Sequence, residues 1–353
     1  MRNDLIIQIE RCSRQVTFRH SPAPLSTFST TIHPTHHPSP FLATMSRAIL
    51  ITGATGKQGG SVLDALVASQ PSDFLLLAVT RDAQSPRAKT LCAKSSSIRL
   101  VEGNLDSIPT LFEAARKAAG SVPLWGVYSM QASIDSRAPL AGELKQGKEM
   151  VDEAIKAGIQ HFVYSSVDRG GNDKSWNNPT FVPHFKTKHD IEIHLRDSTA
   201  NGKSSMGWTI LRPVNFIDSI APGFQSKVFM TAVRNTLKEK PLQWVVTKDI
   251  GVFAAKAFHD PTAWANKAVG IAGDELTFSQ LSQTFERVTG RRAGTIFGFL
   301  GKALMAGVAE LGSMINWLRD EGYNIDIEEV KKVHPDITSV ETWLKTSAFA
   351  ERS

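Results

Sequence analysis

Residues 48–60 read A-I-L-I-T-G-A-T-G-K-Q-G-G, an apolar run that leads directly into the glycines Gly53, Gly56 and Gly59. A helix-like run follows at 61–69. At this spacing the first glycine lets the chain turn off a strand, the second lets backbone N–H groups approach a pyrophosphate, and the third lets helix and strand pack closely. Such turns also occur as purely structural connections. The apolar strand before the glycines and the amphipathic helix after them favour a dinucleotide-binding turn.

The apolar run at 74–80, F-L-L-L-A-V-T, predicts a second parallel strand. Arg81 ends it, 22 residues after Gly59, where an NAD-specific site usually carries an acid for the ribose. An arginine suits a 2′-phosphate instead, and Lys57 in the glycine turn could add a second positive charge. Two alternatives stay open: Asp82 could take the acid role if the strand ended one residue later, and Arg81 could be a solvated charge. We expect NADP(H), with NAD(H) as the second choice.

Strands and helices alternate along the next part of the chain, which predicts a Rossmann-type doubly wound parallel sheet. The expected strands are 98–101, 124–129, 161–166 and 208–211, and the expected helices are 109–119, 141–157 and 185–196, with a long loop at 168–183. Beyond Pro213 the pattern loosens. It predicts helices at 249–259 and 278–288, a strand at 268–271, and a mainly helical segment at 294–345. This half should form a smaller, mainly helical subdomain that walls a substrate or partner cleft.

We therefore expect a leader at 1–45, an NADP-binding core at 46–215, a C-terminal subdomain at 216–345 and a tail at 346–353. Within the subdomain, 249–273 should return to the core. The leader is rich in Ser, Thr, Pro and His, and Met45 would start the domain cleanly, so we interpret the leader as disordered. Localisation would then be cytoplasmic or nuclear. A mitochondrial presequence is the alternative, because the leader carries more Arg than acid. His33, His36 and His37 lack Cys or carboxylate partners and do not suggest a metal site.

Composition excludes several classes of protein. The chain of 353 residues is 41% hydrophobic and 21% charged, as in ordinary globular proteins. Its net charge of +6 is scattered rather than striped along one helix, which argues against a nucleic-acid partner. Cys12 and Cys92 lie too far apart in sequence for a C-x-x-C motif, so neither a disulfide framework nor a zinc site is expected. Lys302 and Glu310 interrupt the apolar stretch 295–318, which argues against a membrane span.

The catalytic pair of short-chain dehydrogenases, Tyr-x-x-x-Lys, is absent, because none of the three tyrosines precedes a lysine by four residues. In its place H-F-K-T-K sets His184 four residues before Lys188, at the head of a helix that should line the cofactor cleft. We predict that Lys188 reaches the ribose or nicotinamide region and that His184 serves as a proton donor near neutral pH. The alternative is that both lie at a solvated helix start. Ser165 and Ser166 could bond a carbonyl or a ribose hydroxyl, or only cap the loop.

Several short motifs, in order, resemble those of the NmrA-like family of atypical short-chain dehydrogenase-type proteins. Besides the glycine turn they are V-T-R at 79–81, V-E-G-N-L-D at 101–106, K-Q-G-K at 145–148, H-F-V-Y-S-S at 161–166, H-F-K-T-K at 184–188, L-R-P-V-N-F at 211–216, D-I-G at 249–251, G-Y-N-I-D and H-P-D-I-T. The resemblance implies a Rossmann fold that binds NADP(H). It places the cofactor site at Gly53, Thr55, Gly56, Lys57, Gln58, Gly59, Arg81 and Lys188. Asn104 stands where many members have Asp, so the adenine contact falls to Asn104 or Asp106.

The resemblance implies two alternative functions. Some family members look like redox sensors that bind the dinucleotide without turning it over and regulate a transcription factor or an enzyme. Others resemble quinone or phenylpropanoid reductases, in which a Lys replaces the missing Tyr. His184 in the Tyr position favours the sensor, which we expect first, with an NADPH-dependent oxidoreductase of a small quinone or enone as the alternative. A protein partner and a homodimer are both compatible with this expectation, and neither direct nucleic-acid binding nor a membrane anchor is expected.

Overall fold

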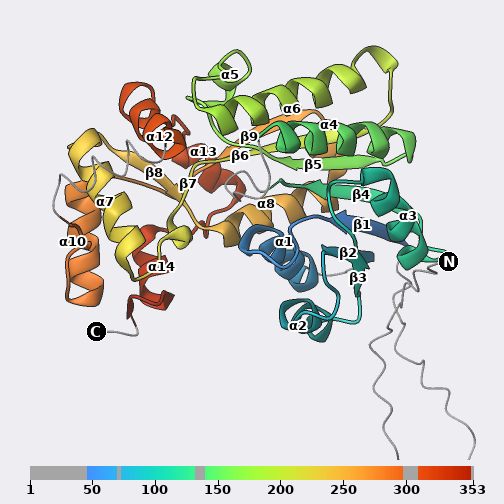
Figure 1. Ribbon diagram of the computed structural model, residues 1–353, viewed down its shortest axis with the longest axis horizontal. Coiled ribbons are helices and arrows are strands. Elements are labelled where there is room, and N and C mark those ends of the chain that lie inside the picture. Colours follow the sequence, from blue (N-terminus) through green and yellow to red (C-terminus); the bar gives the residue numbers. More distant parts are fainter. Residues whose placement is uncertain (1–45, 70–72, 132–139, 297–308, 351–353) are drawn as a thin grey trace, which may run out of the picture.

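A seven-stranded parallel sheet forms the centre of the molecule (Figure 1). The computed structural model describes residues 46–69, 73–131, 140–296 and 309–350. The strand order is β3-β2-β1-β4-β5-β6-β9, and every neighbouring pair is parallel. The strands are β1 (Arg47–Ile51), β2 (Phe74–Thr80), β3 (Ile98–Glu102), β4 (Leu124–Ser129), β5 (His161–Ser165), β6 (Gly207–Pro213) and β9 (Lys267–Ile271). This order confirms the predicted doubly wound sheet. Strand order reverses at β1, where the glycine turn leaves the sheet.

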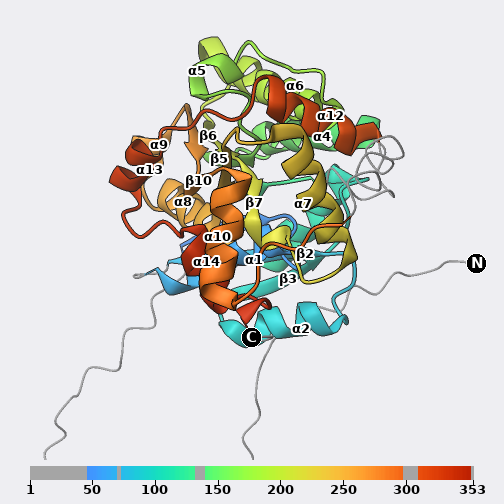
Figure 2. The ribbon, with the colours of Figure 1, turned by 90° about the vertical axis from the view of Figure 1, so that its left-hand side faces the viewer.

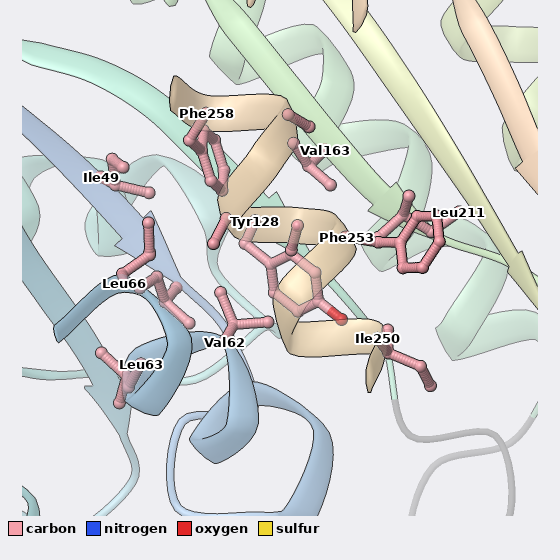
Figure 3. Close-up of a cluster of buried hydrophobic side chains, with 14 of the residues drawn as sticks. Ile49, Val62, Leu63, Leu66, Tyr128, Val163, Leu211, Ile250, Phe253 and Phe258 are labelled. Atoms are coloured by element: carbon pink, nitrogen blue, oxygen red, sulfur yellow. The ribbon is translucent and has the colours of Figure 1, made fainter. Parts of the chain in front are cut away.

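Helices cover both faces of this sheet. One face packs against α1 (Lys57–Ala68) and α8 (Thr247–His259), and the other against α3 (Ile108–Ala119), α4 (Leu140–Lys156) and α6 (Pro183–Thr199). In β1, Ile49 and Ile51 face the first layer while Ala48 and Leu50 face the second, as the two-residue period of a strand requires. Figure 3 shows Val62 of α1, Phe253 of α8 and Tyr128 of β4 among the side chains of the first of these cores. Burial on both faces explains the apolar runs read from the sequence.

Four connecting elements around the core are short. The helix α2 (Pro86–Lys94) follows β2 and was not predicted; Ser85 caps it by accepting a hydrogen bond from the Ala88 N–H, and Pro86 opens it. The predicted long loop at 168–183 contains a single turn, α5 (Asn172–Ser175). Two further short elements are η1 (Ala200–Gly202) and α9 (Pro261–Trp264).

A second, three-stranded sheet begins the C-terminal part, which Figure 2 views from its own side. Its order is β10-β8-β7. The strands are β7 (Asn215–Phe216), β8 (Leu242–Val245) and β10 (Asp274–Leu276), and the accompanying elements are η2 (Ile217–Ser219), α7 (Phe224–Leu237), α10 (Phe278–Thr289), α12 (Ala309–Asp320), α13 (Ile327–Val333) and α14 (Val340–Thr346). The subdomain is mainly helical, as predicted, but the sequence analysis did not anticipate the small sheet or α7.

The described residues include some of the features predicted from the sequence and leave out others. The helix predicted at 278–288 is α10, and it begins with a capping box, since the side chains of Thr277 and Gln280 bond each other's backbone; Gly290 ends the helix in a left-handed conformation. Of the described helices, none combines the length and apolar composition that a membrane crossing requires. The leader, including His33, His36 and His37, and much of the stretch 295–318 lie outside the described residues.

Helices α1 and α8 approach each other closely, and this approach depends on Gly251. A Cβ at this position would lie 2.3 Å from the carbonyl oxygen of Ser61. We expect Gly251→Ala to lower the free energy of unfolding by about 1–3 kcal/mol, because backbone atoms cannot move aside as side chains can. Urea unfolding followed by circular dichroism measures this change.

Gly60→Ala is the matched control on α1, where the added Cβ would meet only Ala54 O at an ordinary 3.4 Å. We expect that variant to change stability by no more than about 0.5 kcal/mol, or to gain slightly from the higher helix propensity of alanine. Equal losses in the two variants would contradict the steric explanation.

Candidate cofactor and substrate site

The glycine turn has the geometry of an anion cradle. Gly53 has φ 64°, and a Cβ there would lie 2.3 Å from Met130 Sδ. A Cβ at Gly59 would lie 2.4 Å from the Gly53 carbonyl oxygen, so helix and turn can approach only with glycine at that position. Gly56 is the N-cap of α1, and neither a capping side chain nor an acid in the first turn satisfies the helix N-terminus. These backbone N–H groups fit a pyrophosphate.

Two side chains fix this turn to the neighbouring strands. The Thr52 hydroxyl donates to Met130 O (2.9 Å) and accepts from Met130 N (2.8 Å), which joins the ends of β1 and β4. Gln58 Nε2 donates to Ser165 Oγ at 2.6 Å, in a fully buried contact with the end of β5. The side chains of Gln58 and Ser165 therefore hold the glycine turn against the end of β5, while Thr55 lies half-buried in the turn.

Arg81 projects from the end of β2 as an exposed side chain. Within the described part of the chain it makes no ion pair, so its guanidinium is available to a phosphate. Asp82 is engaged locally, because its Oδ1 accepts a hydrogen bond from Gln84 N at 2.8 Å. The Lys57 ammonium donates to the backbone carbonyl of Asp218 in η2, and its role toward a phosphate stays a prediction. Lys57 thus links the glycine turn to the C-terminal part.

The two candidates for the adenine contact lie after β3, and both are exposed. Asn104 Oδ1 accepts from Asp106 N at 2.9 Å, which closes a local turn. The Asp106 carboxylate in turn accepts from Gln146 Nε2 of α4 at 2.9 Å. The structure brings the two residues together, and their role toward adenine stays a prediction.

Lys188 lies within the fold, one helical turn after His184 on the same face of α6. Lys188 is 9% exposed and His184 6%, so the alternative of a solvated helix start is wrong. The Lys188 ammonium pairs with Glu143 Oε1 of α4 at 3.2 Å and lies 6.0 Å from the centre of the Tyr164 ring. Glu143 itself is 1% exposed. Lys188 is therefore one half of a buried ion pair rather than a lone lysine.

The environment of His184 disfavours its charged form. Burial, and secondarily the positive charge of Lys188, lower the pKa of His184 to about 4. At pH 7 the imidazole is therefore neutral. It can donate or accept a hydrogen bond, but it does not hold the extra proton that the predicted role as proton donor near neutral pH would require.

A cavity of about 540 Å³ opens beside these two side chains. Its walls come from the ends of β5 and β6, the start of α6, the small sheet, and helices α7 and α12. They are mostly apolar, and the largest side chains are Phe185, Phe216, Phe229, Trp244, Met314 and Tyr323. Ser166 lines the cavity too. This volume falls in the range of small-molecule sites, and its position outside the carboxyl ends of parallel strands is where such folds bind ligands.

A fully buried charge cluster supports the cavity wall behind Ser166. Glu192 accepts from Arg169 Nη2 and from Arg212 Nη2, each at 2.7 Å. Burial alone would raise the pKa of Glu192, but the two guanidinium groups hold it below its usual range. Arg169 Nη1 donates to Val167 O at 2.9 Å, and this contact fixes the backbone next to Ser166.

Four of these charged residues were not predicted from the sequence: Glu143, Arg169, Glu192 and Arg212. One signal was available: Glu192 follows Lys188 by four residues and Lys188 follows His184 by four, so all three lie on one helical face. Glu143 had a weaker signal, since it lies four residues before Gly147 of the K-Q-G-K motif on the same face of α4.

Known proteins resemble this chain in sequence and in fold. The model of the NmrA-like family matches residues 45–344. The NmrA-like family domain-containing oxidoreductase hkm9 of Aspergillus hancockii is 30% identical over 261 residues, which cover 70% of this chain and 74% of hkm9.

Two solved structures share the fold at lower identity. NmrA, a negative transcriptional regulator crystallised with NADP, has a TM-score of 0.61 at 16% identity, over 86% of this chain and 95% of NmrA. The NADPH-dependent quinone oxidoreductase QOR2 of Escherichia coli, crystallised with NADPH, has a TM-score of 0.59 at 18% identity, over 85% of this chain and 98% of QOR2. The match to the family model spans both the sheet and the C-terminal part, and the chain therefore belongs to the NmrA-like family.

Proposed function

We propose that this protein is an NADP(H)-dependent oxidoreductase that acts on a small, apolar quinone or enone-type molecule. The observation that carries the proposal is the apolar cavity of about 540 Å³ with the Lys188 ammonium at its wall. A protein that only sensed the dinucleotide would not need an apolar cavity of this size beside Lys188. The oxidoreductase name of the relative hkm9 and the quinone activity in the name of QOR2 add support.

The residues present fit the cofactor. The uncapped N-terminus of α1 would hold the pyrophosphate, and the exposed Arg81 would hold a 2′-phosphate. Lys188 would reach the ribose or nicotinamide region from α6. The bound dinucleotide would supply the hydride.

The protein's own part in the reaction is electrostatic and steric. The Lys188 ammonium, held by Glu143, would stabilise negative charge that develops on a carbonyl oxygen of the substrate. The neutral imidazole of His184 would offer a hydrogen bond to the same oxygen or to a second one. The aromatic side chains of the cavity would exclude water and hold the ring of the substrate flat against the cofactor cleft.

Redox sensing is the second candidate, and one observation favours it. Tyr164, whose ring centre lies 6.0 Å from the Lys188 ammonium, is fully buried, and burial together with the charges of Glu143 and Glu192 raises its pKa well above the ordinary value. It cannot replace the missing catalytic tyrosine. A sensor would instead present its NADP(H)-dependent state to a transcription factor or enzyme partner, which requires that the two oxidation states interact differently with the protein.

Turnover separates the two functions. Purified protein should oxidise NADPH in the presence of 1,4-naphthoquinones or cyclic enones, with reduced product formed in equal amount. Calorimetry with the four dinucleotides should be run on the same preparation. Tight binding of NADP(H) without oxidation across the panel would overturn the oxidoreductase and support the sensor.

A further inference from the structure

The cavity presents little net charge to a ligand. Among its described lining residues, Lys188 is the sole side chain with a full charge at pH 7, because the lowered pKa of His184 leaves that ring neutral. The fully buried charges behind the wall are two positive and two negative: Arg169 and Arg212 are balanced by Glu192 and Asp168. The charge that a ligand meets therefore depends on what compensates Lys188.

Glu143 supplies that compensation, and the packing of two helices places it there. On α4, Glu143 lies one turn before Gly147, and a Cβ at Gly147 would lie 2.3 Å from Ile191 Cδ1 of α6. Ile191 lies on the same face of α6 as Lys188, three residues later. The close approach at Gly147 thus brings the Glu143 carboxylate within 3.2 Å of the Lys188 ammonium, although Glu143 itself does not line the cavity.

We propose that Glu143 determines the charge selectivity of this cavity: by neutralising Lys188 it makes the site accept uncharged molecules that carry a carbonyl oxygen and reject anions of the same shape. The class of ligand rests on the proposed function. The charge selectivity rests on the buried pair itself. In a site of low polarity the attraction between a lone ammonium and an anion is far stronger than in water, so a carboxylate at 3.2 Å offsets much of it for an ionised ligand. The paired ammonium still has N–H groups that can donate to an oxygen in direct contact with it.

The test compares two ligands of one ring system. At pH 7, 2-hydroxy-1,4-naphthoquinone is an anion and 2-methoxy-1,4-naphthoquinone is neutral. Their affinities for the full chain with NADP⁺ present can be measured by calorimetry, where no turnover occurs. We expect the wild-type protein to prefer the neutral compound, and Glu143→Gln to raise the ratio of anionic to neutral affinity by about tenfold.

Two further variants test whether the change in the affinity ratio comes from charge. Lys188→Met removes the ammonium and keeps the Glu143 carboxylate, so it should shift the ratio of anionic to neutral affinity in the opposite direction. The inference therefore stays testable if Glu143→Gln folds poorly. Glu149→Gln is the matched control, because Glu149 lies on α4 and pairs with Lys145 at 3.6 Å on the surface. It changes the net charge equally and should leave the ratio unchanged.

A ratio in Glu143→Gln that moves less than twofold, or no more than in Glu149→Gln, would overturn the inference. Equal losses of affinity for both ligands in Glu143→Gln would mean that Glu143 has only a structural role, and would also overturn the inference. Failure of the wild-type protein to bind the methoxy compound would overturn it too. A failure of the proposed function would give a different result: the ligands would bind with the expected selectivity, but NADPH would not be oxidised.

Discussion

Replacing Lys188 by methionine is expected to lower the rate of NADPH oxidation with a naphthoquinone substrate by about 100-fold or more. The loss of one positioned donor to a developing oxyanion costs about 10²–10³ in rate. Methionine keeps most of the side-chain volume, so the cavity should keep its shape. Steady-state kinetics with the quinone varied at saturating NADPH measures the effect. We expect most of it in kcat, since the ammonium acts most strongly on charge that appears during reaction.

Lys186→Met is the matched control for this variant. Lys186 lies two residues earlier on α6, but its side chain is 58% exposed and pairs with Asp190 at the surface. It should change kcat by less than about twofold, because a solvated ion pair contributes little. A similar loss in the two variants would show that α6 tolerates neither change, and a Lys188→Met protein with more than a third of the wild-type rate would remove Lys188 from the reaction.

The sequence was enough to predict the core because each core element carries a local signal. Glycines at 53, 56 and 59 can be recognised without knowing what they touch, and a run such as 74–80 is apolar along its whole length because both faces of β2 are buried. The small sheet was not predicted because its strands carry no such local signal. Strand β7 spans two residues and β10 spans three, too short for any periodicity, and their partners are distant in sequence.

The electrostatic part of the site could not be read from local patterns. Glu143 becomes the partner of Lys188 only when α4 and α6 approach at Gly147, and a sequence does not state that distance. Asp249 gives a second case: it accepts hydrogen bonds from His334 Nε2 at 3.1 Å and from Thr338 N at 3.0 Å, more than 80 residues away. The motifs D-I-G and H-P-D-I-T were visible separately, and the contact between them was not.

The prediction that His184 titrates near neutral pH was wrong because the fold buries the imidazole. An unperturbed imidazole does so, and the sequence gives no measure of burial. Phe185 and the cavity wall remove water from the ring, and Lys188 adds a positive charge one turn away. Both effects disfavour the imidazolium, which leaves the paired ammonium of Lys188 as the cation of the site.

Replacing Arg81 by aspartate is expected to weaken NADP(H) binding by about 100-fold while changing NAD(H) affinity by less than about threefold. Arg81 is exposed and unpaired within the described part of the chain, so its removal breaks no internal contact. A guanidinium bound to a phosphate contributes a charge-assisted hydrogen bond, and aspartate adds repulsion. NAD(H) lacks the 2′-phosphate and instead gains a carboxylate that can accept from its ribose hydroxyl. Calorimetry with all four dinucleotides measures both affinities.

Lys89→Asp controls for the general change in charge. Lys89 is an exposed residue of α2, downstream of the same loop, and the substitution alters the net charge by the same amount. If Arg81 acts through direct contact with the 2′-phosphate, Lys89→Asp should weaken NADP(H) by no more than about threefold, because a solvated charge beyond the first contact is screened by salt. Parallel losses for NADP(H) and NAD(H) in Arg81→Asp would instead mean that Arg81 supports the loop after β2. The choice between the two dinucleotides would then have to come from elsewhere in the site.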